Sequence, residues 1–412
     1  MGPTGLGSTI LLSDRPSFLE HFPPMGIYEV LFSFLDSAGT YMGNPGTHPW
    51  AQGFPLTTQL PGGPEVPTSV SFDSTDLKYP PATGTPELLE AIRDYYNHFY
   101  DAGIATDNIA VFAGGRPGIF ATMSFLDPAI PILIEETEYT PYWDLLQLMK
   151  RNYSVVSSNP SNRFRPTLDD YRTASSEAGS DQRRFIIKSN PCNPTGVTWS
   201  GDDLSSLVAF ASEPNHGAIL DEAYEFYHSP NPVSALQYIE DIDATDIFVV
   251  GAATKGLQVP GLRTGWVVAS TENIEIFRNY SSFGMGGVAR PSQILVSQLL
   301  EIGRVTTARE AVGEFYSEQR ARYHDGLSDC GIELMTGDGG FYHWGRLPGG
   351  LTAREFNDRL FEHKAAILPG PLTDLLRRGD NGPLGEFIRF SFGPILPETY
   401  DSNLAIIKAA LA

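Results

Sequence analysis

Short apolar runs alternate with helix-like stretches along the middle of this sequence, and the alternation limits the fold more than any other feature. The apolar runs have the length of strands and lie at residues 109–113, 130–135, 153–157, 185–188, 217–221, 247–251 and 266–269. Helix-like stretches lie at residues 86–100, 117–126, 141–151 and 202–213. Because strands that alternate with helices assemble into parallel sheets, the pattern predicts an α/β fold with a mostly parallel, seven-stranded sheet.

Two domains are expected from the length of the chain and from where this pattern stops. The 412 residues exceed the ~50–250 residues of a typical single domain. We expect residues 46–289 to form a large domain around the sheet, and residues 1–45 with 290–412 to form a smaller α+β domain. The elements expected in the smaller domain are one long helix and two strands, at 291–329, 341–344 and 387–392.

Charge and composition exclude several classes of partner. The net charge of −21 opposes nucleic acid and anionic membranes, since binding to phosphate groups needs clustered Lys and Arg. No apolar run approaches the ~18 residues of a membrane span, and residues 1–8 lack the basic start of a secretion signal. The two cysteines are too few for a disulfide framework or a metal site. We therefore expect a soluble, cytoplasmic protein without a metal.

Lys255 stands in a setting that is unusual for a surface lysine. It follows the apolar run Ile247-Phe248-Val249-Val250 and precedes Arg263 by eight residues in a loop rich in Gly and Pro. A dry pocket or a cationic neighbour lowers the pKa of such an amine and makes it a nucleophile. The arrangement predicts a lysine that forms a Schiff base, with an arginine placed to neutralise a phosphate.

Two upstream motifs place polar side chains where strands are expected to end. The run 185–188 leads into Ser-Asn-Pro-Cys-Asn-Pro-Thr-Gly, a turn that would point Asn193 at a pocket. The run 217–220 leads into Asp-Glu-Ala-Tyr, which puts Asp221 and Tyr224 after a neighbouring strand. Open α/β sheets bind their ligands at the carboxyl ends of the strands. The motifs Asn-Pro-x-Asn-Pro-Thr-Gly, Asp-x-Ala-Tyr and Lys-x7-Arg, in this order, resemble the class I/II aminotransferase family, the fold-type I enzymes that depend on pyridoxal 5′-phosphate (PLP).

The resemblance covers almost the whole chain and implies roles for four catalytic and cofactor-binding residues. Lys255 would form the Schiff base with PLP and then move the proton of the substrate Cα. Asp221 would keep the pyridine nitrogen protonated, so that the ring accepts electrons. Asn193 and Tyr224 would hydrogen-bond the 3′-oxygen of the cofactor, and Asn193 would also face the substrate.

A second group of residues is expected around the cofactor phosphate. Arg263 matches the phosphate-binding arginine of the family. Residues 109–120 predict a strand, a glycine turn and a helix, so the backbone amides of Gly115 and Arg116 would face the phosphate. The family often has a serine three residues before the lysine, whereas this chain has Ala252. Thr254 or the charged Arg116 can replace the contact that is lost with this serine.

The remaining resemblances concern the cofactor ring, the substrate and a second subunit. Tyr139 matches the aromatic residue that stacks on the ring, and Arg389 matches the arginine that holds the substrate carboxylate with a two-pronged hydrogen bond. Tyr79 matches the tyrosine that reaches the phosphate of a neighbouring subunit, which implies a homodimer with shared active sites. Arg290, after a glycine-rich loop, is a candidate for an anionic part of the substrate. The Pro/Gly-rich stretch 43–67 is expected to line the entrance.

Three functions are compatible with a PLP enzyme fold. An aminotransferase passes the amino group of an amino acid to the cofactor and then to a 2-oxo acid, and it is the expected function. A lyase, cyclase or elimination-replacement enzyme resembling 1-aminocyclopropane-1-carboxylate synthase is the alternative. It would expel a leaving group from an amino acid such as S-adenosylmethionine, in specialised metabolism. The third, a PLP-sensing regulator, needs a DNA-binding module, for which the chain has neither spare length nor basic charge. The substrate side chain is left open.

Overall fold

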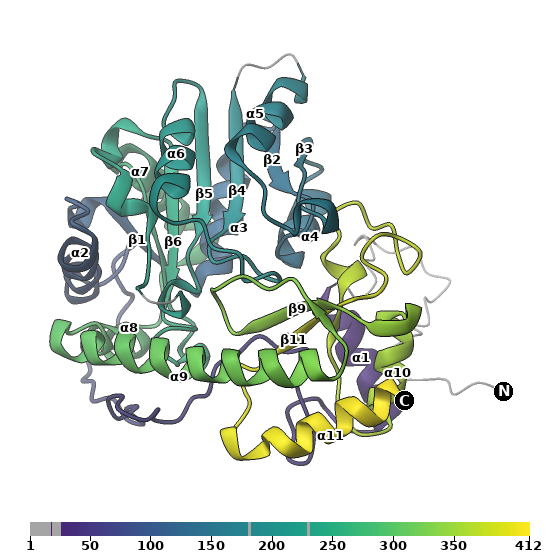
Figure 1. Cartoon of the computed structure of the whole chain (residues 1–412). Coiled ribbons are helices and arrows are strands. Elements are labelled where there is room, and N and C mark those ends of the chain that lie inside the picture. Colours follow the sequence, from purple (N-terminus) through teal and green to yellow (C-terminus); the bar gives the residue numbers. More distant parts are fainter. Residues whose placement is uncertain (1–17, 19–25, 180–182, 229–230) are drawn as a thin grey trace.

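The computed structural model describes residues 18, 26–179, 183–228 and 231–412. Within them the chain forms two sheets that are packed with helices, as Figure 1 shows. Most of the small-domain segment expected at residues 1–45, namely 1–17 and 19–25, lies outside the described residues, and so does the stretch 1–8 that was searched for a secretion signal. The predicted boundary between residues 289 and 290 stays a prediction.

The larger sheet has seven strands in the order β1-β7-β6-β5-β4-β2-β3. All neighbouring strands are parallel except for β7, which runs antiparallel to both β1 and β6. The predicted α/β fold with a mostly parallel, seven-stranded sheet is therefore confirmed. The strands are β1 (Ile109–Phe112), β2 (Ile132–Glu135), β3 (Tyr153–Val156), β4 (Arg184–Ser189), β5 (His216–Asp221), β6 (Ile247–Ala252) and β7 (Gly265–Val268).

Helices cover both faces of this sheet because its strands are apolar on both sides. In β5, Ala218 and Leu220 pack into one hydrophobic cluster, whereas Ile219 between them packs into the other. The first cluster includes residues of α2 (Pro86–Tyr100), α5 (Leu168–Glu177) and α6 (Gly201–Ala211). The second includes residues of α3 (Gly115–Phe125), α4 (Thr140–Leu148) and α7 (Thr271–Tyr280). Alternate side chains of a strand point to opposite faces, so a three-layer structure results.

The smaller sheet is antiparallel, with the strand order β10-β11-β9-β8. Its strands are β8 (Glu333–Leu334), β9 (Tyr342–Arg346), β10 (Leu368–Pro369) and β11 (Phe387–Ser391). The helices outside the larger sheet's layers are α1 (Ile27–Ala38), α8 (Arg290–Leu299), α9 (Ile302–Asp329), α10 (Ala353–Phe361) and α11 (Tyr400–Leu411). This part of the chain has the α+β character that the sequence predicts.

The prediction of a single long helix across 291–329 is wrong, because the structure has two helices there. α8 ends at Leu299, and α9 begins at Ile302. Glu301 between them has a non-helical backbone, with φ −52° and ψ 129°, and its carboxylate accepts hydrogen bonds from the N–H groups of Gly303 and Arg304. A carboxylate that caps the first free N–H groups starts a new helix, and neither Gly nor Pro is needed to signal the break.

Three neighbouring strands end at the same edge of the larger sheet, and their following loops carry the predicted site residues. β4 ends at Ser189, β5 at Asp221 and β6 at Ala252. The smaller sheet lies beyond this edge (Figure 1), and Arg389 of β11 hydrogen-bonds to Asn193 of the loop after β4. The site is thus formed where the two sheets meet.

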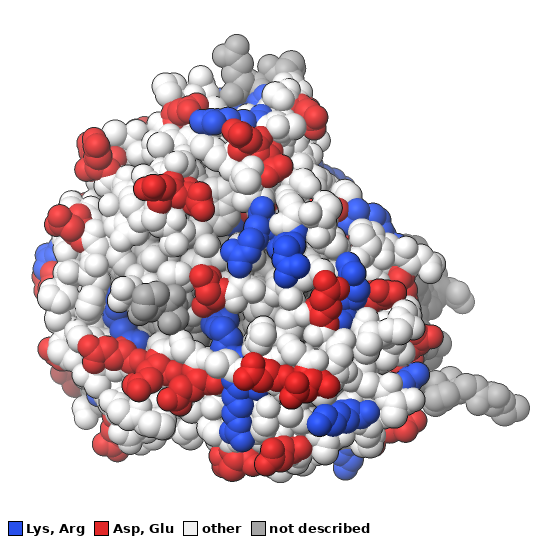
Figure 2. All heavy atoms as spheres, viewed as in Figure 1, with Lys and Arg blue, Asp and Glu red and all other residues white. Residues whose placement is uncertain are grey.

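The surface of the face seen in Figure 1 carries a row of acidic side chains over α9 (Figure 2). Exposed acidic residues of this helix include Glu310, Glu314 and Glu318, which lie four residues apart and so share one side of the helix. Such a row repels phosphate groups. Within the described residues, no helix combines the length and the apolar character that crossing a membrane requires.

Candidate active site

Lys255 lies just beyond the end of β6, with its amine inside the site. The side chain is half-buried, and its Nζ donates a hydrogen bond to the carbonyl oxygen of Gly53. Burial lowers the pKa of Lys255 to about 7, and the positive charges of Arg389 and Arg116 add to this effect. An amine with such a pKa is largely neutral at physiological pH, and the neutral form is the nucleophile.

Asp221 is the last residue of β5 and is held by two donors. Its Oδ2 accepts a hydrogen bond from the Tyr142 hydroxyl at 2.8 Å, and its Oδ1 accepts one from the N–H of Ala223 at 3.1 Å. Burial raises the pKa of Asp221, while these hydrogen bonds and the charge of Lys255 oppose the rise. Tyr142 was not among the residues predicted from the sequence. Its signal is the spacing to Tyr139, because residues three apart share a helix face and Tyr139 immediately precedes α4.

Arg389 is a buried cation without an acidic partner among the described residues. It is 5% exposed, and its Nη1 donates to Asn193 Oδ1 at 2.8 Å while its Nη2 donates to the Ala51 carbonyl at 2.5 Å. The guanidinium also stacks on the Tyr342 ring at 4.3 Å, and its Nε has no hydrogen-bond partner in the described part of the chain. Because a buried charge that lacks a counter-charge is costly, this arrangement is suited to an anionic ligand.

Tyr224 and Tyr342 meet beside Lys255. Their hydroxyl groups hydrogen-bond to each other, and the Lys255 amine lies 5.5 Å from the centre of the Tyr224 ring. The space next to them requires a glycine at position 53, since a Cβ there would lie 2.3 Å from the Tyr342 hydroxyl. From the sequence, Tyr342 was predicted only as part of a strand. Its contacts with Tyr224 and Arg389 were not predicted, because they join residues far apart in the chain.

A glycine turn and Arg263 lie together at the other end of the site. Gly114 caps α3 with a φ of 108°, and a Cβ on it would come within 2.4 Å of the Arg263 guanidinium. Arg263 donates hydrogen bonds to the carbonyls of Ala113 and Pro260, at 3.2 and 3.0 Å. The N-terminus of α3 and a nearby guanidinium together suit a phosphate.

The other residues predicted around the phosphate lie near this turn. Gly115 and Arg116 form the first turn of α3. A Cβ on Gly115 would be 3.9 Å from the Cβ of Ala252, so the position where relatives often have serine faces the turn. Thr254 is half-buried directly before Lys255. A hollow of about 550 Å³, lined mainly by apolar groups, opens beside Arg116, Arg263 and Tyr142.

Tyr139 joins the assembled site, whereas Tyr79 and Arg290 do not. Tyr139 caps α4, and its ring meets that of Tyr142 edge to face at 5.3 Å. Tyr79 is 93% exposed. Arg290 donates from Nε and Nη2 to one oxygen of Asp76, at 3.1 and 2.9 Å. Its guanidinium is therefore engaged within the same chain, and its predicted contact with substrate stays a prediction.

The two sheets and the lysine, aspartate and arginines between them define a fold-type I PLP-dependent enzyme. The family model "Aminotransferase class I and II" matches residues 63–402. The chain belongs to this family, whose members depend on PLP, and it is an enzyme.

The similar proteins include aspartate aminotransferases and a 1-aminocyclopropane-1-carboxylate synthase. An aspartate aminotransferase from Pyrococcus horikoshii is 25% identical over 82% of this chain and 84% of its own. A 1-aminocyclopropane-1-carboxylate synthase from Nicotiana tabacum is 24% identical over 79% of this chain and 69% of its own. Among solved structures, an aminotransferase from Mycobacterium tuberculosis has a TM-score of 0.77 at 21% identity and covers 97% of this chain and 99% of that chain. These structural likenesses define the fold.

The chemistry of the site fits PLP. Lys255 offers an amine whose pKa is lowered to about 7, and the tight approach of Gly114 to Arg263 leaves a cradle without side chains. Asp221 offers a carboxylate, and Arg389 offers a guanidinium whose Nε is unpartnered among the residues that the structure describes. When bound, PLP supplies a ring that withdraws electrons from the substrate Cα.

Proposed function

We propose that this protein is an aminotransferase that moves the amino group of an amino acid to a 2-oxo acid through a Schiff base on Lys255. The observation that carries the proposal is that Arg389 is buried and has no acidic partner within the described residues. Arg389 and Lys255 bind the carbonyls of Ala51 and Gly53, two residues apart in the chain. An amino acid carboxylate on Arg389 would thus bring its Cα close to the lysine.

Each remaining residue has a role in this proposal. Lys255 removes and returns the proton at Cα, in keeping with its low pKa. Asp221, supported by Tyr142, holds the proton of the pyridine nitrogen. Tyr224 and Asn193 donate hydrogen bonds to the 3′-oxygen of the cofactor, and Asn193 also orients Arg389. These groups act on atoms of the cofactor or the substrate.

The contacts at the two ends of the cofactor complete the proposed site. Gly115, Arg116, Thr254 and Arg263 bind the phosphate, and Tyr139 stacks on the ring. Tyr79, with its exposed ring, reaches the phosphate of a second subunit, so the proposed assembly is a homodimer. Arg290 contacts an anionic substrate group only if the ion pair with Asp76 opens.

A cyclase or lyase is the second candidate because of the similarity to 1-aminocyclopropane-1-carboxylate synthase. Both functions begin with removal of the Cα proton by Lys255 and differ in what happens to the amino group. An aminotransferase leaves the amino group on the cofactor, whereas a cyclase or lyase releases a leaving group and keeps the aldehyde form of PLP.

The deciding experiment is a half-reaction of the purified holoenzyme with single amino acids. Aspartate and glutamate are tested first, then a broad panel that includes S-adenosylmethionine. We expect stoichiometric conversion of the cofactor to its amine form, and recovery of the aldehyde form after addition of a 2-oxo acid. Consumption of a substrate with the cofactor spectrum unchanged, and no conversion by any amino acid, would establish the second candidate instead.

A further inference from the structure

Glu138 is a buried carboxylate that contacts two separate walls of the site. It is 3% exposed and lies between β2 and α4, directly before Tyr139. Its Oε1 accepts a hydrogen bond from the N–H of Tyr139 at 2.7 Å and another from the Ser189 hydroxyl. Its Oε2 accepts one from the N–H of Ser189 at 3.1 Å. One carboxylate therefore ties the start of α4 to the end of β4.

Ser189 extends this connection to Asn193. The N–H of Asn193 donates to Ser189 Oγ at 3.1 Å, and the Asn193 side chain accepts from Arg389 at 2.8 Å. A continuous series of hydrogen bonds thus runs from Tyr139 through Glu138, Ser189 and Asn193 to Arg389. Glu138 accepts three of these hydrogen bonds, from the Tyr139 N–H and from the N–H and hydroxyl of Ser189.

The surroundings of Glu138 favour a positional role over a general contribution to stability. Burial and the charge of Glu135 raise the pKa of Glu138 to about 8. Glu135 itself bonds to Lys188 and to the Tyr171 hydroxyl. A second carboxylate beside Glu135 is therefore unfavourable, and only the hydrogen bonds that Glu138 accepts from Tyr139 and Ser189 offset this cost.

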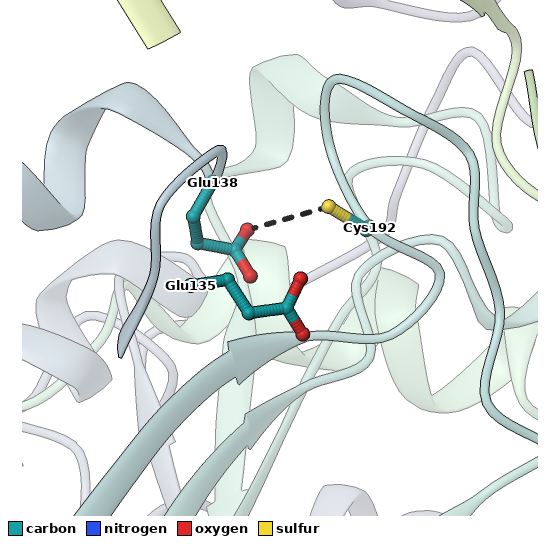
Figure 3. A group of neighbouring side chains, drawn as sticks. All are labelled: Glu135, Glu138 and Cys192. Carbon is teal, nitrogen blue, oxygen red and sulfur yellow. Dashed lines mark hydrogen bonds between the residues drawn. The ribbon is translucent and has the colours of Figure 1, made fainter. Parts of the chain in front are cut away.

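Glu135, Glu138 and Cys192 form a tight group (Figure 3), with candidate ligand atoms within 4.8 Å of one another. Cys192 Sγ lies 3.8 Å from Glu138 Oε1, and burial raises the pKa of this thiol, which keeps it protonated. Both carboxylates already accept hydrogen bonds from protein donors. Within the group the Cys192 thiol donates to Glu138, whereas Glu135 bonds to Lys188 and Tyr171 outside the group.

We infer that Glu138 is a positioning residue that fixes Tyr139 and Asn193 relative to each other, and so sets how the cofactor ring and its 3′-oxygen are held. The inference rests on the proposed function, which assigns the ring to Tyr139 and the 3′-oxygen to Asn193. Ser189 is the link through which Glu138 acts on Asn193. Neither Glu138 nor Ser189 is required to touch the cofactor.

The test compares Glu138→Gln with Glu135→Gln in the full-length protein. An amide at position 138 places an NH2 group against at least one N–H or O–H donor. The amide at position 135 replaces an equally buried carboxylate that does not contact the Tyr139 or Asn193 backbone, so this variant is the control. Two quantities are measured by titration of the apoenzyme with PLP: the dissociation constant, and the pH midpoint of the change in visible absorption of the bound cofactor. The melting temperature of each apoenzyme is recorded separately.

For Glu138→Gln we expect ~10-fold weaker PLP binding, the size typical of leaving a buried donor unsatisfied. We also expect a higher pH midpoint, because a 3′-oxygen that loses a donor holds the neighbouring proton more strongly. Glu135→Gln should melt at a lower temperature but keep the wild-type midpoint. In an Asn193→Ala background, Glu138→Gln should no longer move the midpoint, since the coupling passes through Asn193.

Ser189→Ala is the second variant, with Tyr171→Phe as its control, because each loses one hydroxyl that bonds to a glutamate of the group. Ser189→Ala should raise the midpoint, and Tyr171→Phe should not. The inference is overturned if Glu138→Gln keeps both wild-type values, or if Glu135→Gln moves the midpoint equally. If Glu138→Gln does not fold, an unchanged midpoint in Ser189→Ala overturns it. A wild-type protein that forms no PLP adduct on Lys255 would overturn the proposed function instead.

Discussion

The charge of Arg389 should control how readily Lys255 reacts. Arg389 is the charged group that lowers the pKa of the lysine most after burial, whereas Asp221 raises it. Replacing Arg389 with Gln removes a positive charge and should raise the pKa of the lysine. Replacing Asp221 with Asn removes a negative charge and should lower it. The two variants are therefore expected to shift the pKa of Lys255 in opposite directions.

The gain in reactive amine follows from how far the pKa of Lys255 is lowered. The pKa falls from 10.5 to about 7. At pH 7 about half of the amine is then neutral, compared with roughly one part in 3,000 for an amine with the unshifted value, a gain on the order of 10³ in the reactive form. This gain in neutral amine is present only above the lowered pKa. Below about pH 7 the lysine of the folded protein is itself mostly protonated.

The assay mixes apoenzyme with PLP at a series of pH values and traps the adduct early with borohydride. The initial rate of labelling on the peptide that contains Lys255 is then plotted against pH. We expect the midpoint near pH 7 for the wild type, a higher midpoint for Arg389→Gln and a lower one for Asp221→Asn. A wild-type midpoint near 10, or shifts of the same sign in both variants, would refute the electrostatic account.

Three further substitutions test the proposed roles. Lys255→Ala should abolish borohydride labelling at this position and lower turnover by at least ~10²–10⁴-fold, as expected for loss of a general acid-base group; labelling at another lysine would show that the assignment is wrong. Arg389→Lys should raise the KM for the amino acid, because an ammonium group cannot reproduce the planar fork, and an unchanged KM in steady-state kinetics would place the carboxylate elsewhere. Tyr142→Phe removes the hydroxyl that donates to Asp221 at 2.8 Å and should lower kcat by ~10-fold, the size of one buried hydrogen bond to a charged group. Wild-type kcat in Tyr142→Phe would show that Asp221 does not depend on this donor.

The sequence predicted the large sheet well because its signal is local. An apolar run marks a buried strand wherever it lies, and the polar residues that follow such runs must meet at the carboxyl edge of a parallel sheet. Asn193, Asp221 and Lys255 were found in this way. Arg389 was predicted from its match to the carboxylate-binding arginine of the family, and the structure places it against Asn193.

Only the tertiary structure revealed the groups that hold these residues in place. The carbonyl that binds Arg389 is 338 residues away, the one that binds Lys255 is 202 residues away, and the Tyr224 and Tyr342 hydroxyls are 118 residues apart. No local sequence pattern indicates such a pair, since the residues next to each member in the sequence are those of an ordinary loop or strand. The break between α8 and α9 was missed for a related reason, because it depends on one glutamate that caps a helix. The sequence by itself thus determined the fold class and predicted the reactive side chains, whose residue types are required by the proposed chemistry. The tertiary structure decided the lowered pKa of Lys255, the burial of Arg389 and the link through Glu138, because burial and long-range contacts exist only after the two sheets have come together.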